Sequence, residues 1–341
     1  MSTAVISPAQ PEQILKGLGK LWTSLGEEEK QHGKPTVLRA SSMTLIVASD
    51  ESDAGYFASQ TISELMREHP SRGVVLSVSA EAEEKPEARV LAQCWKPFGK
   101  AQQICCEQIE IKARPERLPD LGPVLLGLTV ADLPVVFWCR HQSALKPDAT
   151  KDQEHGLEIV MDLATKSIFD LREVATEQAF ELLSKWRTQG RVIADLEWTR
   201  LTPWREPIGH IFDNVARENK FSSFGRIEIA YAADKVPMSA LYAGGWLSAP
   251  YRPTVSFQKV NGYGPGLHSI TMHSDIEKIT FERTGKECMR LVSTNGRERQ
   301  YNLAEPSITS LMTEELSIIG PDSAFDSAFA RAEELFREQR H

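Results

Sequence analysis

Met43-Thr-Leu-Ile-Val-Ala-Ser49 and Gly73-Val-Val-Leu-Ser-Val-Ser79 are the two stretches that decide the fold class of this chain. Each is a continuous apolar run, which is typical of a strand buried on both faces. The residues between them predict a helix over about 54–68, which Pro70 ends. Candidate N-cap residues for that helix are Asp50, Ser52 and Asp53. Strand, helix and strand in this order predict a βαβ unit with a parallel pair and a right-handed crossover.

The flanking sequence extends this unit into an α/β domain. Apolar residues at three- and four-residue spacing predict a helix over 11–30. Two alternating runs, 89–95 and 103–112, predict a hairpin around Lys96-Pro-Phe-Gly-Lys100. The polar, aperiodic residues 141–156 predict a mobile loop. Further patterns predict a helix near 119–128, strands over 133–138 and 158–162, and helices over 172–188 and from Pro203.

Beyond about residue 218 the pattern changes to short strand-like runs separated by Gly, Asn and charged turns. These runs are 225–232, 253–260, 267–272, 276–283, 287–294 and 298–303. One helix over about 236–248 interrupts them, and a charged amphipathic helix over 322–339 follows. The sequence therefore predicts an N-terminal mixed or parallel sheet with flanking helices, followed by a smaller antiparallel-rich α+β domain. The expected boundaries are a helical extension over 1–35, the α/β domain over 36–218 and the second domain over 219–341.

Composition excludes several classes of protein. The chain has 341 residues, 41% of them hydrophobic and 25% charged, with a net charge of −8. The longest nearly uncharged apolar stretch, 121–130, is shorter than a membrane span needs. The acidic balance disfavours nucleic acid and anionic membranes as partners. Five cysteines and an N-terminus without a signal-peptide pattern favour a cytoplasmic protein in a reducing compartment.

The sequence contains none of the common signatures for catalysis, cofactors or metals. G-x-x-x-x-G-K-[ST], H-E-x-x-H, C-x-x-C and G-x-S-x-G are all absent. Gly262-Tyr-Gly-Pro-Gly266 fits a turn better than a dinucleotide loop, because Pro265 lacks the N–H that an anion needs. His268 and His273 are expected on opposite faces of a strand, which disfavours a shared metal. We therefore expect no catalytic residue, no cofactor and no metal.

Three cysteines lie in or beside the predicted hairpin. A turn about 97–99 places Cys94 opposite Cys105, and the adjacent Cys106 then points to the other face of the sheet. Such cysteines are either small buried hydrophobic residues or members of a redox switch. The first interpretation is favoured, and we expect activity not to depend on a disulfide.

The segment Asp195-Leu-Glu-Trp-Thr-Arg-Leu-Thr-Pro-Trp-Arg-Glu206 is the densest group of charged and aromatic residues. Thr202 followed by Pro203 predicts a helix start. Two interpretations stay open for the Arg and Trp residues around it. They form an exposed face for a partner protein or an anion, or they form an internal network with the acidic residues that locks the helix to the sheet. The candidate residues for the face are Trp198, Arg200, Thr202, Trp204, Arg205 and Arg140.

The run DLEWTRLTPWRE (195–206) resembles the signature of the glucose-6-phosphate dehydrogenase assembly protein family, OpcA. Three more segments match the family in order: HPSR (69–72), ICCEQIEI (104–111) and DLPVVFW (132–138). The resemblance covers about residues 36–250. It implies a non-catalytic cytoplasmic protein that promotes assembly or activity of glucose-6-phosphate dehydrogenase, in support of the oxidative pentose phosphate pathway and NADPH supply. Family members in oxygenic phototrophs are also tied to thioredoxin, but the ambiguous cysteines here do not carry over a redox partner.

Two other classes of function remain open. In the first, the chain is a sugar-phosphate sensor or enzyme that uses the carboxyl ends of its parallel strands, with Arg140 and Arg200 as phosphate ligands. Otherwise it is a scaffold that binds the dehydrogenase without changing its activity.

Overall fold

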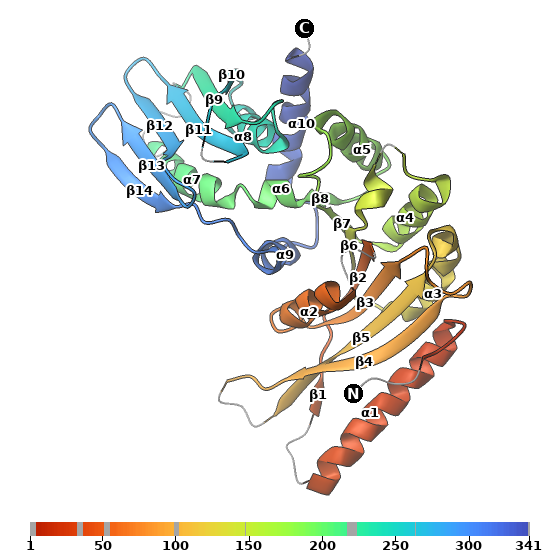
Figure 1. The fold of residues 1–341 in the computed structure, drawn as a ribbon. Helices are drawn as coiled ribbons and strands as arrows, with labels where there is room; N and C mark the ends of the chain where they lie inside the picture. The colour runs from red at the N-terminus through yellow and green to blue at the C-terminus, as the bar shows by residue number, and fades with distance from the viewer. Residues whose placement is uncertain are drawn as a thin grey trace. The chain divides into compact units, whose positions relative to one another are not determined.

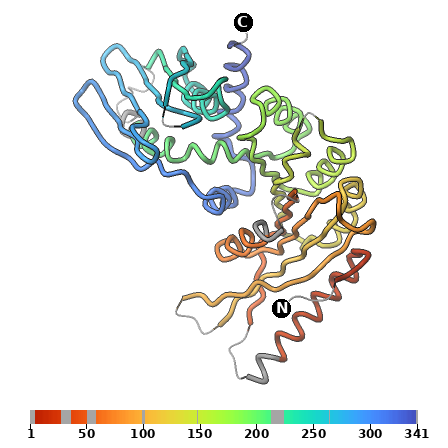
Figure 2. The backbone as a smooth tube through the Cα atoms, viewed as in Figure 1, coloured from red at the N-terminus to blue at the C-terminus, as the bar shows by residue number. Residues whose placement is uncertain are grey.

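The computed structural model describes residues 5–32, 37–50, 55–98, 102–146, 148–216, 224–262 and 264–339. These residues form two compact units (Figures 1 and 2). Unit 1 comprises Met1–Asp170, Leu183–Ala194 and Ile308–Gly320, and unit 2 comprises Leu171–Leu182, Asp195–Ser307 and Pro321–His341. The expected domain boundaries near residues 35 and 218 lie outside the described residues.

Unit 1 is built on a largely parallel sheet in the order β1-β5-β3-β2-β6-β7-β8, with β4 antiparallel to β5. The strands are β1 (Val37–Arg39), β2 (Met43–Asp50), β3 (Ser71–Val78), β4 (Glu87–Trp95), β5 (Gln103–Ala113), β6 (Val135–Arg140), β7 (Lys166–Phe169) and β8 (Ile193–Asp195). The helices are α1 (Pro11–His32), α2 (Gly55–Leu65), η2 (Pro115–Leu121), α3 (Gly122–Leu128), η3 (Gln142–Leu145), α4 (Lys151–Leu163) and α9 (Ile308–Leu316). Figure 1 shows α1 running beside β4.

The predicted βαβ unit is confirmed. β2 and β3 pair in parallel from Met43 opposite Ser71 to Asp50 opposite Val78. Both strands are almost entirely buried, as their continuous apolar runs indicated. β6 pairs with the other edge of β2. After β2 the chain continues to β3 on one side of this pair, and after β6 it continues to β7 on the other side. The carboxyl ends of β2 and β6 are therefore a topological switch point.

The prediction of a mobile loop over 141–156 and a strand over 158–162 is wrong. The residues form η3 and the helix α4, and the next strand is β7. Thr150 starts α4 with a capping box, in which its hydroxyl accepts from the amide of Gln153 and the Gln153 side chain accepts from the amide of Thr150. Leu157, Val160 and Met161 then share one buried face at helical spacing. The cap residues Ser52 and Asp53 and the hairpin turn at Gly99 lie outside the described residues, and Asp50 is the last residue of β2.

Unit 2 is built on a second sheet in the order β10-β9-β11-β12-β13-β14, antiparallel except for β10 and β9. Its strands are β9 (Arg226–Ala232), β10 (Thr254–Lys259), β11 (Gly266–His273), β12 (Lys278–Arg283), β13 (Cys288–Ser293) and β14 (Glu298–Asn302). Its helices are α6 (Leu196–Thr199), α7 (Thr202–Ala216), α8 (Met238–Ser248) and α10 (Ser323–Glu338), while α5 (Thr176–Thr188) begins in unit 2 and ends in unit 1. The alternating burial of β9 shows why the sheet is one-sided: its inward residues Ile227, Ile229 and Tyr231 are buried.

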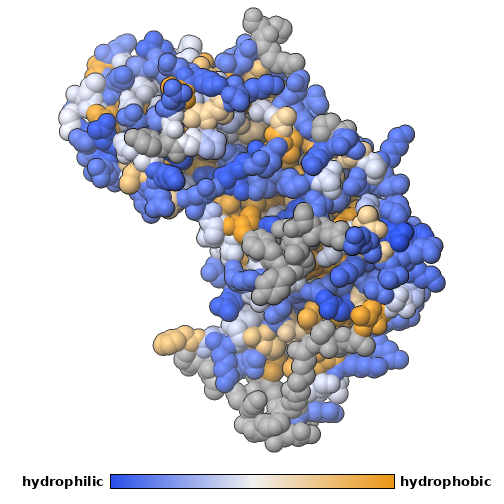
Figure 3. Space-filling view, viewed as in Figure 1, coloured by the Kyte–Doolittle hydropathy of each residue, from blue (hydrophilic) through white to orange (hydrophobic). Residues whose placement is uncertain are grey.

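The fold is α/β with an additional antiparallel-rich α+β part, as predicted. α8 and α10 lie side by side (Figure 1), and Gly245 permits this approach because a Cβ there would overlap the backbone of Ala328 and Ala332. The face seen in Figure 3 is mostly hydrophilic, with hydrophobic residues in small scattered groups. Among the described residues, no helix combines the length and apolar character that crossing a membrane requires. The helix α9 had no counterpart among the predicted elements.

Candidate functional site

The 195–206 segment begins with a buried carboxylate. Asp195 ends β8 and is fully buried. Its side chain accepts hydrogen bonds from the amides of Leu171 (3.3 Å) and Glu197 (3.0 Å) and from the hydroxyl of Tyr242 (2.9 Å). This one carboxylate therefore links the end of β8 to α6, to α8 and to the segment before α5. These hydrogen bonds give Asp195, the first residue of the family signature, a structural role.

The two tryptophans of the segment are buried. Trp198 is 3% exposed and Trp204 is 4% exposed. The indole Nε1 of Trp198 donates to Asp322 at 3.1 Å, and its ring packs edge-to-face against Tyr242. The guanidinium of Arg205 lies 3.9 Å from the Trp198 ring centroid. The expectation that these tryptophans present an exposed face is therefore wrong, because both are used in the core, as the internal-network interpretation describes.

Three polar residues of the candidate face, Arg200, Thr202 and Arg205, are only partly buried. Arg205 donates to the hydroxyl of Thr202 at 2.7 Å, and Arg200 donates to Glu197 at 3.3 Å. Arg200 and Trp204 also line a pocket of about 1340 Å³ that lies wholly within unit 2. The other walls of this pocket come from residues 172–177, the connection from β9 to α8, the end of β12, the residues after β14 and the end of α10. The segment thus supplies one wall of this pocket.

Arg140 belongs to unit 1, whereas the other residues of the candidate face belong to unit 2. It ends β6 at the switch point, with its guanidinium 4.8 Å from the ring centroid of Trp138. It lines a smaller pocket of about 260 Å³ together with Asp50, Cys139, Gln142 and other residues of unit 1. The predicted pairing of Arg140 with Arg200 is therefore not a feature of either pocket.

The switch point is closed by a hydrogen-bonded cluster. His141 Nδ1 hydrogen-bonds Asp50 Oδ1, and the amide and hydroxyl of Ser143 donate to the same carboxylate at 3.2 and 2.8 Å. Burial raises the pKa of Asp50, but hydrogen bonds from His141 and Ser143 and the charge of His141 outweigh it, so the pKa is lowered overall. This cluster occupies the place where open α/β sheets commonly bind a ligand.

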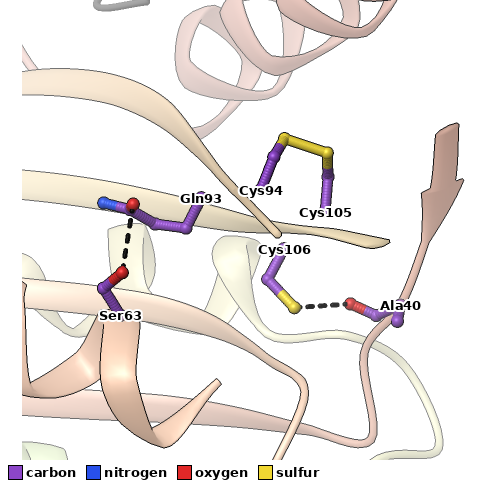
Figure 4. Close-up of a disulfide and its surroundings, with 6 residues drawn as sticks. All are labelled: Ala40, Ser63, Gln93, Cys94, Cys105 and Cys106. Carbon is purple, nitrogen blue, oxygen red and sulfur yellow. Dashed lines mark hydrogen bonds between the residues drawn. A yellow bond between two sulfur atoms is a disulfide. The ribbon is translucent and has the colours of Figure 1, made fainter. Parts of the chain in front are cut away.

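The structure contains a disulfide between Cys94 and Cys105 (Figure 4). The two residues are opposite one another in the β4–β5 register, as the predicted hairpin required. The preference for two unbonded buried thiols is wrong, because this cross-strand pairing brings the sulfur atoms together. Cys106 points to the other face, where its thiol donates to the carbonyl of Ala40 at 3.3 Å. Burial raises the pKa of Cys106 to about 11, so this thiol is protonated near neutral pH.

Two of the matching family segments meet inside unit 1. Arg72 of HPSR donates to Glu107 of ICCEQIEI at 2.6 Å and to the carbonyl of Leu128 at 2.8 Å. Glu107 also pairs with Arg39 at 2.7 Å and accepts from the indole of Trp22 at 2.6 Å. Arg72 is therefore a buried strand residue rather than part of a simple turn. Sequence reasoning missed Glu107, although an acid within a buried alternating strand was a signal for a buried partner.

Comparison with known proteins places the chain in a family. Residues 62–184 match a model described as the glucose-6-phosphate dehydrogenase subunit N-terminal domain, and residues 191–329 match its C-terminal domain. The chain belongs to the OpcA family. Among its relatives, the OxPP cycle protein OpcA of Synechocystis is 29% identical over 59% of this chain and 41% of its own length. That of Nostoc punctiforme is 25% identical over 76% of this chain and 60% of its own length.

The chain spans between about two fifths and three fifths of the length of these curated relatives. Solved structures with a similar course of the chain include an oxidoreductase from Klebsiella pneumoniae, at 10% identity and a TM-score of 0.43, covering 87% of this chain and 94% of that one. An oxidoreductase from Sinorhizobium meliloti has 9% identity and a TM-score of 0.41, covering 89% and 91%. In the described ranges, no three His, Cys, Asp or Glu residues are grouped to hold a metal ion.

Proposed function

We propose that this chain is a non-catalytic assembly factor and activator of glucose-6-phosphate dehydrogenase, acting in the cytoplasm in support of the oxidative pentose phosphate pathway and NADPH supply. The observation that carries the proposal is the match of both family domains, in order, along most of the chain. Those domains are described as parts of a glucose-6-phosphate dehydrogenase subunit, so the dehydrogenase is the proposed partner.

The chemistry of the family segments supports this role. Asp195 and the Arg72–Glu107 pair are engaged in hydrogen bonds that hold strands and helices together. Groups used in this way stabilise a scaffold, whereas catalytic acids and bases need access to a substrate. The proposal therefore assigns binding to the outer surfaces that this scaffold supports.

The test combines purified chain and purified cognate dehydrogenase. We expect co-elution in size-exclusion chromatography and a rise in dehydrogenase activity on titration with the chain. Heat-denatured chain is the control for folding, and 6-phosphogluconate dehydrogenase is the control for binding to a dehydrogenase other than the proposed partner. Binding without a change in activity would support the scaffold alternative, and no binding would refute the proposal.

One further comparison addresses the candidate face. Trp204→Ala is expected to lower the melting temperature, because Trp204 is buried. Arg205→Ala removes a partly exposed side chain, and loss of activation at unchanged melting temperature would assign Arg205 to the partner face. A lowered melting temperature with full activation at lower temperature would assign it to the internal network.

A sugar-phosphate sensor or enzyme remains the second candidate, since Arg140 lines a pocket at the switch point of the parallel sheet. Incubation of the chain alone with isotope-labelled sugar phosphates tests it. Turnover or retention that is lost in Arg140→Met would favour this candidate over the assembly role.

A further inference from the structure

The large pocket of unit 2 is lined by an arginine that has one buried donor without a partner among the described residues. Arg283 is the last residue of β12 and lines the pocket. Its Nε is buried without a hydrogen-bond partner among the described residues. Burial lowers the pKa of Arg283 from its ordinary value, and only the charge of Glu305 opposes this effect. A buried donor without a partner lowers the stability of the folded state. A ligand that accepts a hydrogen bond from this donor would account for its presence.

Two further arginines face the same carboxylate from other parts of unit 2. Arg172, before α5, hydrogen-bonds Glu305 directly. The pKa of Glu305 is lowered by this hydrogen bond first, against the effect of burial, and also by the charges of Arg172, Arg200 and Arg283. Three arginines from separate segments thus act on a single carboxylate in the pocket. This arrangement is typical of an anion site.

Two carboxylates pair with these arginines, and the structure holds Glu197 more firmly than Glu305. Glu197 lies in the first turn of α6, is buried, and pairs with Arg172 at 3.4 Å and Arg200 at 3.3 Å. Glu305 lies in the irregular segment after β14 and its side chain is 66% exposed. Glu197 is therefore a fixed positioning residue, whereas Glu305 can leave at little cost. When Glu305 leaves, Arg172, Arg200 and Arg283 remain around its position with one carboxylate, that of Glu197. This local excess of arginine suits the charge of about −2 on a phosphate monoester.

We propose that this pocket binds a small organic molecule through its phosphate group, with the three arginines as ligands of the phosphate and Glu305 as the group that the phosphate displaces. The volume of about 1340 Å³ is far larger than an inorganic phosphate needs. Trp204, Pro237 and Phe336 supply apolar wall for the organic part. Exposed residues of both signs also line the pocket: Lys235, Lys286, Glu173, Glu177, Asp234 and Glu287. The proposal does not depend on the assembly role, and the pocket is separate from the switch point of unit 1.

Isothermal titration calorimetry on the full chain tests the proposal, with inorganic phosphate, glucose 6-phosphate and, as the uncharged comparison, glucose. We expect saturable binding of glucose 6-phosphate, weaker binding of inorganic phosphate and none of glucose. Arg283→Met should weaken binding about tenfold or more, because a charge-assisted bidentate contact is lost. Glu305→Gln should tighten binding at least about threefold, because the competing carboxylate is gone.

Arg290→Met is the matched control. Arg290 lies on the neighbouring strand β13 and also has a buried Nε without a partner in the described structure, but it pairs with Glu282 and Glu298 and does not line the pocket. Its substitution should leave affinity unchanged. Melting temperatures without ligand separate binding from folding, since Arg283→Met removes an unsatisfied donor and should not lower the melting temperature.

Three results would overturn the proposal. The first is no saturable binding of glucose 6-phosphate up to about 10 mM. The second is unchanged affinity in Arg283→Met. The third is equal affinity for inorganic phosphate and glucose 6-phosphate, which would show that the organic part of the ligand contributes nothing to binding. Glu305→Gln keeps the proposal testable if Arg283→Met does not fold, because Glu305 is mostly exposed.

Discussion

Arg72 of unit 1 and Arg283 of unit 2 are both shielded arginines on sheet strands, and they differ in what satisfies them. Arg72 is enclosed, with Glu107 at 2.6 Å and the carbonyl of Leu128 at 2.8 Å. Arg283 borders an open pocket, and its buried Nε has no partner among the described residues. The same side chain thus completes the core in one unit and remains available for a ligand in the other.

The ends of the two sheets repeat this difference. In unit 1 the switch point is occupied by the Asp50, His141 and Ser143 cluster, which leaves a pocket of about 260 Å³. In unit 2 a pocket of about 1340 Å³ lies at an end of the antiparallel-rich sheet. Fold type alone places a ligand at the switch point. The side chains point instead to the other sheet, because the Asp50 carboxylate at the switch point already accepts hydrogen bonds from His141 and Ser143.

The sharpest test of this comparison replaces the carboxylate that pairs with arginine in each unit, Glu107 in unit 1 and Glu305 in unit 2. Glu107→Ala should lower the free energy of unfolding by about 3–5 kcal/mol, because it leaves buried Arg72 without its charge partner. Glu305→Ala should cost no more than about 1 kcal/mol, since Glu305 is 66% exposed and its pair with Arg172 is screened by solvent. Urea unfolding of both variants measures the difference. Equal losses in the two variants would show that the unit 2 cluster is as closed as that of unit 1.

The disulfide of unit 1 is the next largest effect. Reduction of the Cys94–Cys105 bond, which spans 11 residues of sequence, should lower the free energy of unfolding by about 3 kcal/mol in the chain-entropy estimate. Cys94→Ser should be unaffected by reductant. Cys288→Ser is the control in unit 2, where the thiol is free and exposed, and it should respond to reductant like wild type. A reductant effect that persists in Cys94→Ser would place the sensitivity elsewhere.

The helix contact of unit 2 is sensitive to volume rather than to charge. Gly245→Ala should lower the free energy of unfolding by about 1–3 kcal/mol, because the added Cβ meets the backbone of Ala328 and Ala332 on α10. Gly209→Ala on α7 has open space around the added Cβ and should be neutral or stabilising by up to about 1 kcal/mol. Thermal unfolding compares the two. A neutral Gly245→Ala would mean that α8 and α10 separate readily.

The smallest expected effect is the pH response of the switch-point cluster. The pKa of Asp50 is lowered from 3.8 in the fold, so its contribution to stability is present above pH 3.8 and is lost as the pH falls through the lowered value. The difference in melting temperature between wild type and Asp50→Asn should therefore shrink in strong acid. Asp120→Asn, which removes an exposed carboxylate, should parallel wild type. A difference that stays constant down to pH 2 would show that Asp50 does not titrate with folding.

Local pattern was sufficient for most of the elements. The apolar runs at 43–49 and 73–79 predicted β2 and β3, and Thr294-Asn-Gly296 lies between the paired strands β13 and β14. The register that joins Cys94 and Cys105 also followed from the hairpin. The failure at 141–163 has a local cause, because Thr150 and Gln153 start a helix whose buried face is short and interrupted by charges.

What the sequence by itself determined is the order and type of most of the elements, since period and turn residues act over a few positions. Only the tertiary structure decided the burial of Trp198 and Trp204, the pairing of Arg72 with Glu107 and the meeting of Arg172, Arg200 and Arg283 at one pocket. Arg72 and Glu107, and likewise the three arginines of the pocket, are separated along the chain by tens of positions, and no local propensity relates them. Whether an arginine is enclosed or left facing a cavity depends on which strands and helices pack around it, because packing alone sets which donors find partners.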